Sequence, residues 1–187
     1  MATKKKVVSK SKRTADKVQP ATGELHVRIV NFSGEIEANT DVPVNIPALS
    51  SQVYLQRPLS DLGMPVGTDT SHVFVVAELV VEGKIASRNL LYLVPSKQIT
   101  LPAAHITSEL TQAADGYHLK LSSPVLARSV YVTFGDLNCE LSDNYFNLLP
   151  DETADIVVKS GESLDKLKAA LKVESLSDAF APSEASR

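Results

Sequence analysis

The sequence lacks tryptophan and contains one cysteine and two methionines among its 187 residues. Because sugar-binding surfaces of β-proteins normally rely on exposed aromatic faces, the absence of tryptophan counts against a stand-alone lectin. The single cysteine, Cys139, excludes an internal disulfide and is compatible with a reducing compartment. No run approaches the roughly 18 apolar residues that a membrane-spanning helix needs, and no apolar segment of a signal peptide follows the basic start. We therefore expect the cytoplasm as the default location and no membrane partner.

The charges divide unevenly along the chain. Residues 1–17 hold seven lysines and arginines against one acidic residue, giving +6, whereas residues 18–187 hold 12 basic and 21 acidic residues, giving −9. A basic tail can contact nucleic acid, but no aromatic side chain is interleaved with these lysines to stack on bases. We interpret residues 1–22 and 181–187 as disordered tails and expect no nucleic-acid partner.

From residue 24 onward, apolar and polar residues alternate with the period of two that is typical of half-buried strands. The expected strands cover residues 24–29, 35–38, 42–46, 52–56, 72–81, 85–94, 105–110, 116–121, 129–134, 155–159 and 173–176. The strand at 72–81 is long and more continuously apolar than the others, which indicates a central strand that is packed on both faces or carries a bulge. One short helix is expected near residues 163–171, where leucines recur at helical spacing behind a serine N-cap, Ser163 or Ser160.

These elements predict an all-β chain of two small immunoglobulin-like β-sandwich domains in tandem, with one short helix near the C-terminus. The boundary falls in the proline-bounded stretch near residues 95–102, so the domains are expected at 23–96 and 97–180. The stretch 122–150 organises the second domain as a strand, a turn at 142–144 and an aromatic corner. Its expected core residues are Val130, Val132, Phe134, Tyr145 and Phe146.

The chemistry-bearing residues form no recognisable catalytic or metal-binding pattern. The four histidines are scattered one per strand, without metal-ligand spacing: His26, His72, His105 and His118. Six carboxylates cluster in sequence: Asp136, Glu140, Asp143, Asp151, Glu152 and Asp155. An oxygen-rich loop of this kind could bind calcium, but the spacing follows turn formation, as in the pair Asp143-Asn144. The sequence therefore assigns no catalytic residue, no cofactor-binding residue and no metal ligand, and it predicts no cofactor.

Two motifs carry a family resemblance. The first is SRNLLYLVPSKQITLP (87–102), with matches at Asn89, Lys97, Leu101 and Pro102. The second is LARSVYVTFGDLNCELSDNYFNLLPDE (126–152), with matches at Ala127, Arg128, Asp143, Asn144, Tyr145, Phe146, Leu148, Leu149 and Pro150. Together with residues 27–54 and 171–180, these motifs resemble the C-terminal end of β-mannosidases of glycoside hydrolase family 2. The family usually has glycine after the proline of the second motif, whereas this chain has Asp151, which tolerates a left-handed backbone less readily.

The resemblance implies a parent enzyme that removes terminal, non-reducing β-D-mannose residues by a retaining mechanism. In that family two glutamates of a (β/α)₈ barrel perform the chemistry, and no position of this chain matches that barrel. The resemblance also implies that the first domain lacks the family's first strands, with the lysine-rich tail in their place, so this domain is expected to be incomplete. We therefore expect non-catalytic accessory domains from a truncated or split gene, without activity alone. The expected partners are a catalytic barrel, as a chain or domain, and a weakly bound glycan.

Two other interpretations stay open at this level. The chain could be a stand-alone β-sandwich module that binds a glycan or a protein partner. It could also be an unstable remnant, since a sandwich without its first strands has an unpaired edge and an uncovered apolar face.

Overall fold

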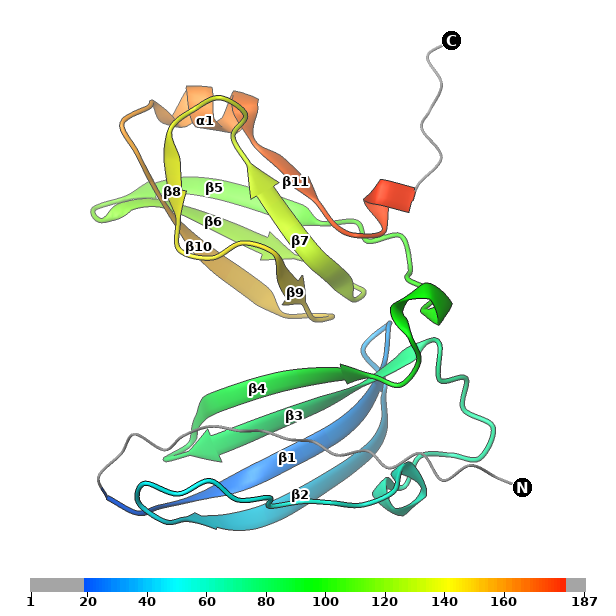
Figure 1. Cartoon of the computed structure of the whole chain (residues 1–187). Helices are drawn as coiled ribbons and strands as arrows, with labels where there is room; N and C mark the ends of the chain where they lie inside the picture. Colours follow the sequence, from blue (N-terminus) through cyan, green and yellow to red (C-terminus); the bar gives the residue numbers. More distant parts are fainter. Residues whose placement is uncertain (1–18, 181–187) are drawn as a thin grey trace. The chain divides into compact units, whose positions relative to one another are not determined.

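The computed structural model describes residues 19–180, which form two compact units (Figure 1). The first unit contains the described residues up to Asn31 and the range Glu35–Thr100. The second contains Phe32–Gly34 and the residues from Leu101 onward. Residues 1–18 and 181–187, which make up most of the expected tails, lie outside the described residues, and the first strand already begins at Ala21.

The first unit is built on one antiparallel sheet with the strand order β2-β1-β3-β4. Its strands are β1 (Ala21–Asn31), β2 (Ile36–Ile46), β3 (Val73–Val81) and β4 (Lys84–Tyr92). The ranges 35–38 and 42–46, expected as separate strands, belong to one edge strand, β2, and an edge position tolerates its Pro43. The central position expected for residues 72–81 is confirmed, and its register shifts between Leu79 and Val80.

Residues 52–56, expected as a strand, form none, so that prediction was wrong. The long connection between β2 and β3 instead packs apolar side chains against one face of the sheet. This connection contains the 3₁₀ helix η1 (Leu59–Leu62). The side chains of the connection that pack against the sheet are Leu55, Leu59, Leu62 and Met64. The sheet side of the cluster is Val27, Ile29, Val73 and Val75. Each such side chain stabilises the unit by about 1.5–3 kcal/mol when fully removed from water.

A buried carboxylate lies within this sheet. Glu78 of β3 is only 4% exposed, although its strand is otherwise strongly apolar. Arg88 of β4, directly opposite in the register, donates from Nε to Glu78 Oε1 at 2.6 Å, and Arg28 of β1 donates to Oε2. One carboxylate therefore connects three neighbouring strands. Because both arginines keep about a third of their side chains exposed, their charges stay partly hydrated.

We expect Glu78→Gln to lower the free energy of unfolding by about 2 kcal/mol, because two arginines lose the charge that compensates them. Chemical denaturation measures the change. Glu82→Gln, in the exposed turn between β3 and β4, serves as the control and should stay within about 0.5 kcal/mol of the parent. Equal stability of the Glu78 variant and this control would contradict a stabilising role for the charge.

The second unit has two sheets (Figure 1). The first has the order β5-β6-β10-β8, and the second has the order β11-β7-β9. The strands are β5 (Thr107–Ala113), β6 (Gly116–Ser122), β7 (Ala127–Thr133), β8 (Cys139–Leu141), β9 (Phe146–Leu148), β10 (Thr153–Ser160) and β11 (Lys172–Glu174). The Asp115-Gly116 turn joins β5 to β6 as expected, and Gly116 has φ +136° with the Val158 carbonyl oxygen 3.0 Å from where a Cβ would stand.

The helix α1 (Leu164–Ala170) connects β10 to β11 and begins after Ser163, as predicted. It is seven residues long, and its Leu167 is completely buried. Two short 3₁₀ helices, η2 (Ser96–Gln98) and η3 (Asp178–Phe180), complete the described elements. Within residues 19–180, no helix has both the length and the apolar character needed to span a bilayer.

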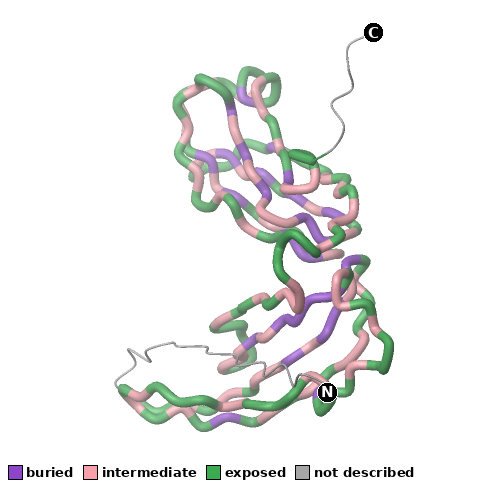
Figure 2. Tube along the Cα trace, turned by 45° about the vertical axis from the view of Figure 1, so that its right-hand side comes forward, coloured by how far each residue is buried: buried purple, intermediate pink, exposed green. Residues whose placement is uncertain are grey.

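The core of the second unit lies between its sheets. The alternation expected for residues 129–134 is confirmed, because Val130, Val132 and Phe134 are at most 3% exposed. On the facing sheet, Leu119 and Leu121 of β6 are completely buried. Figure 2 shows buried stretches of this unit as short segments, separated by exposed or half-buried residues. Residues 19–180 thus form an all-β structure of two immunoglobulin-like domains in tandem with one α-helix.

Candidate functional site

The corner between β8 and β9 is held by one asparagine. Asn144 accepts a hydrogen bond from the Val132 N–H at its Oδ1 (2.9 Å) and donates from its Nδ2 to the Val132 carbonyl (2.9 Å). This side chain therefore takes the place of a neighbouring strand at Val132 of β7, whose other neighbour is Val173 of β11. Asp143 supports the corner by accepting the Asn144 N–H at 2.8 Å, in agreement with the predicted turn.

A second asparagine repeats this contact further along β7. Asn147 Oδ1 accepts the Ser129 N–H at 3.0 Å, where Ser129 has φ +52° and the register of β7 with β9 shifts. Backbone groups of an irregular strand need hydrogen-bond partners, and here side chains provide them. Sequence reasoning treated residues 142–144 only as a turn and missed this role of the two asparagines.

The corner places Tyr145 on the surface, so its predicted core position was wrong. Tyr145 is 69% exposed, and its ring stacks on Tyr131 of β7 with 5.0 Å between the ring centroids and 24° between the ring planes. Its backbone is left-handed, with φ +60°. Because this residue interrupts the extended backbone, the alternation restarts at Phe146, which packs against the core as expected.

Asp151 closes the corner in the conformation that a glycine would favour. Its φ is +59°, and its N–H donates to the Ser123 carbonyl at 3.2 Å. The left-handed turn of the family motif is therefore kept without glycine. Aspartate is among the residues that tolerate this region, although less well than glycine.

We expect Asn144→Ala to lower the free energy of unfolding by about 2–3 kcal/mol, because the N–H and the carbonyl of Val132 both lose a partner. Thermal or chemical denaturation measures the loss. Asn45→Ala is the control, because Asn45 lies exposed on the edge strand β2 and should change stability by less than about 0.5 kcal/mol. A small effect at Asn144 would mean that water replaces the side chain.

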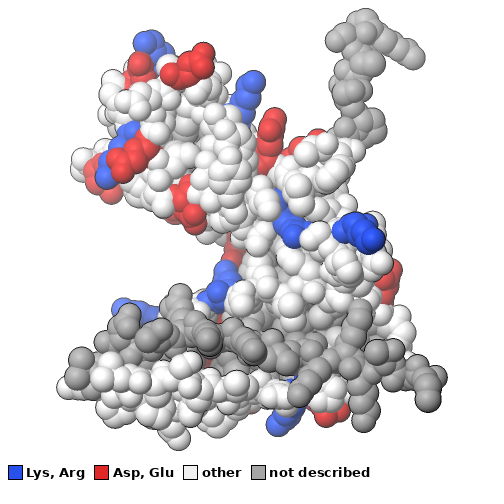
Figure 3. Space-filling view, viewed as in Figure 1, with Lys and Arg blue, Asp and Glu red and all other residues white. Residues whose placement is uncertain are grey.

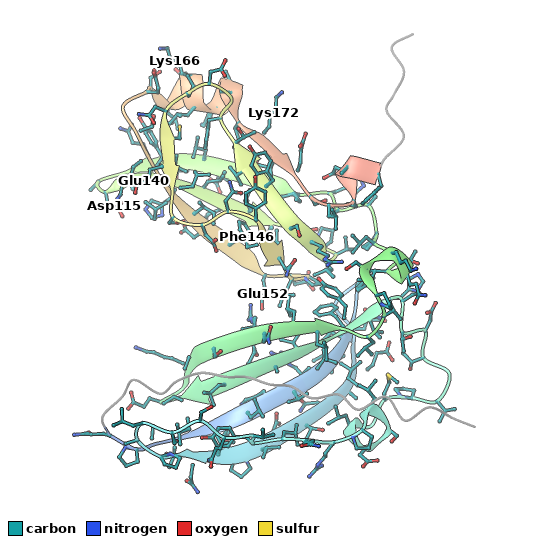
Figure 4. All side chains as sticks on the ribbon, in the orientation of Figure 1. Asp115, Glu140, Phe146, Glu152, Lys166 and Lys172 are labelled. Carbon is teal, nitrogen blue, oxygen red and sulfur yellow. The ribbon has the colours of Figure 1, made fainter. Side chains whose placement is uncertain are left out.

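The six clustered carboxylates do not converge. Glu140 lies 3.7 Å from Lys159, and Asp143 caps Asn144. In Figure 4, Asp115 and Glu140 lie at one edge of the second unit, and Glu152 lies far from both of them. Acidic and basic side chains are interspersed over the visible face of this unit (Figure 3). Within residues 19–180, no group of three or more His, Cys, Asp and Glu side chains is placed to hold a metal ion.

Three of the four histidines lie beside carboxylates, a pairing that the sequence did not suggest. His26 contacts Asp41 (3.0 Å) and Glu24 (3.3 Å), and His72 contacts Asp69 (2.9 Å). The fourth, His105, is exposed.

The clearest electrostatic arrangement joins His118 of β6 to two carboxylates. Its Nδ1 lies 2.9 Å from Asp155 of β10, and its Nε2 lies 3.2 Å from Asp115 in the turn before β6. Hydrogen bonds to Asp155 and then to Asp115 raise the pKa of His118, and the bond to His118 lowers the pKa of Asp115. No Ser, Thr or Cys among residues 19–180 is hydrogen-bonded to the His118 ring, so this group joins a histidine to two carboxylates without a nucleophile.

We expect His118→Gln to remove a pH-dependent part of the stability. A raised folded-state pKa means that the stabilisation is fully present below the unfolded value, 6.5, and is lost as the pH rises through the folded value. The variant should therefore be less stable than the parent at pH 5.5, and the two should converge in mildly alkaline buffer. Denaturation midpoints over this pH range measure the difference. A constant difference at every pH would show a packing effect instead.

The two halves of the chain match two family models. Residues 14–98 match the mannosidase Ig/CBM-like domain, and residues 101–179 match the Ig-fold domain of the Ig_mannosidase family. The chain is a tandem of mannosidase immunoglobulin-like domains. The resemblance to the C-terminal region of a family 2 β-mannosidase is thereby confirmed.

Solved structures resemble these mannosidase domains. A β-D-mannosidase from Dictyoglomus thermophilum is 24% identical with a TM-score of 0.69, and the match covers 86% of this chain and 19% of that one. The exo-β-D-glucosaminidase CsxA is 18% identical with a TM-score of 0.53, covering 91% of this chain and 25% of that one. The mannosidase domains thus span a fifth to a quarter of those chains, and the likeness shows their fold. A comparison with curated protein sequences gives no significant match.

Proposed function

We propose that these mannosidase domains serve a β-mannosidase whose catalytic barrel lies on another chain or in another part of the same protein. The barrel would remove terminal, non-reducing β-D-mannose residues with retention of configuration, and the domains would brace it. The observation that carries the proposal is that both halves of the chain match accessory-domain families of mannosidases.

The chemistry of the described residues supports a non-catalytic role. A retaining glycosidase holds two carboxyl groups about 5–5.5 Å apart across the scissile bond. Here the candidate acids serve local contacts: Glu140 with Lys159, Asp143 with Asn144, and Asp155 with His118. Glycoside hydrolysis requires two carboxyl groups in different environments, one protonated to act as the acid and one ionised to act as the nucleophile. The contacts of these acids do not form such a pair.

We expect the recombinant chain, produced in a host without β-mannosidase, to release no 4-nitrophenol from 4-nitrophenyl β-D-mannopyranoside above the buffer rate. The same chain, tagged and isolated from its own cells, should carry β-mannosidase activity together with a barrel-bearing chain, or as part of a longer one. Turnover by the recombinant chain would exclude the non-catalytic role. A native preparation without mannosidase activity would exclude the barrel partner.

The second candidate function is weak binding of a glycan by the mannosidase domains themselves. A stand-alone glycan-binding module would also need such a binding surface. The observation in favour is the exposed Tyr145 ring stacked on Tyr131. Sugar binding by β-proteins normally needs exposed aromatic rings, and the sequence alone had placed Tyr145 in the core. Saturable binding of a β-1,4-mannan oligosaccharide to the purified chain tests this candidate. It is independent of the turnover assay, so either proposal can fail without the other.

A further inference from the structure

The Tyr131–Tyr145 pair lies on the outer face of the three-stranded sheet β11-β7-β9. Tyr131 alternates with Val130 and Val132, both buried in the core, so its side chain leaves the sheet on the opposite side. Asn147 alternates in the same way with Phe146, which packs on the core, and the ring contact with Tyr131 places Tyr145 on the same outer side. The rings therefore meet outside the sandwich, where their own stacking holds them together.

The exposed ring is held in place before any ligand arrives. Tyr145 is 69% exposed, yet its backbone occupies the left-handed region at φ +60°, which is unusual for an aromatic residue. The Asn144 side chain fixes the preceding residue to β7, and Tyr131 supports the ring from one side. A fixed ring loses little conformational entropy on binding. A strained residue that presents an apolar ring to water also points to binding rather than to stability.

Polar groups flank the pair. Glu174 of β11 is directly opposite Tyr131 in the register and is exposed, which places their Cβ atoms about 4.5–5.5 Å apart. Asn147 is also exposed, and only its Oδ1 is used, for the Ser129 N–H. A carboxylate accepts hydrogen bonds from hydroxyl groups, and the free amide group of Asn147 can donate them.

We propose that Tyr145 is the stacking platform for a hexopyranose ring of a β-linked oligosaccharide, with Glu174 and Asn147 at its polar edge. This inference rests on the glycan contact proposed above and names its site. A pyranose ring offers an apolar C–H face and a rim of neutral hydroxyls, which matches one aromatic face flanked by a carboxylate and an amide. The nearby charges balance, because exposed Lys172 and Glu174 occupy the same strand, so a polyanion gains no net attraction here.

The test is an NMR titration of the isotope-labelled full chain with β-1,4-mannotetraose. We expect saturable shifts centred on Tyr145, Asn147 and Glu174. Tyr145→Asn removes the ring but suits the left-handed backbone, and it should weaken binding by about tenfold or more. Tyr145→Phe keeps the ring and should stay within about twofold of the parent. Phe180→Ala is the matched control, because it removes another exposed aromatic ring, 79% exposed, outside the platform.

Each outcome decides the inference. Saturable binding that Tyr145→Asn abolishes and Phe180→Ala leaves unchanged supports the platform. Binding that survives Tyr145→Asn overturns the site and leaves the proposed glycan contact standing elsewhere. No saturable shift in the parent chain overturns both, whereas the accessory role is decided by the turnover assay. Loss of a co-purifying barrel chain in Tyr145→Asn, with unchanged titration, would assign the ring to a protein interface instead.

Discussion

The two hydrogen bonds between Asn144 and the Val132 backbone are the interaction on which the second unit depends. At this point β7 has no regular strand beside it on the corner side, so without Asn144 the amide and carbonyl of Val132 would lack protein partners. A side-chain amide that donates and accepts at once replaces a strand with a single residue. The corner can then turn sharply, return Phe146 to the core and expose Tyr145.

In the first unit, ion pairs connect neighbouring strands in a comparable way. Glu78 is buried on the central strand, and the arginines of both neighbouring strands meet it. A buried carboxylate alone would be costly, and a pair of partly hydrated arginines removes most of that cost. In both units, therefore, one polar side chain connects backbone segments that hydrophobic burial alone would not align so specifically: Glu78 from within an apolar strand, and Asn144 from a turn.

Neither the Asn144 hydrogen bonds nor the Glu78 ion pairs form a catalytic arrangement. Among the described residues, His118 with its two carboxylates lacks a hydrogen-bonded nucleophile, and the raised pKa of His118 predicts an effect on stability rather than on catalysis. The family matches place both halves among mannosidase accessory domains. The exposed Tyr131–Tyr145 pair is the surface feature on which the proposed glycan site is based.

The sequence by itself determined the all-β class, the tandem arrangement, the β5–β6 and β3–β4 hairpins and the short helix, because period-two alternation and turn residues are local signals. The sequence motif around Asn144 also indicated the family. Only the tertiary structure decided that Glu78 meets two arginines from other strands, that His118 lies between two carboxylates, and that Tyr145 faces water. These are contacts between distant residues or consequences of one left-handed backbone angle, and neither leaves a periodic trace in the chain.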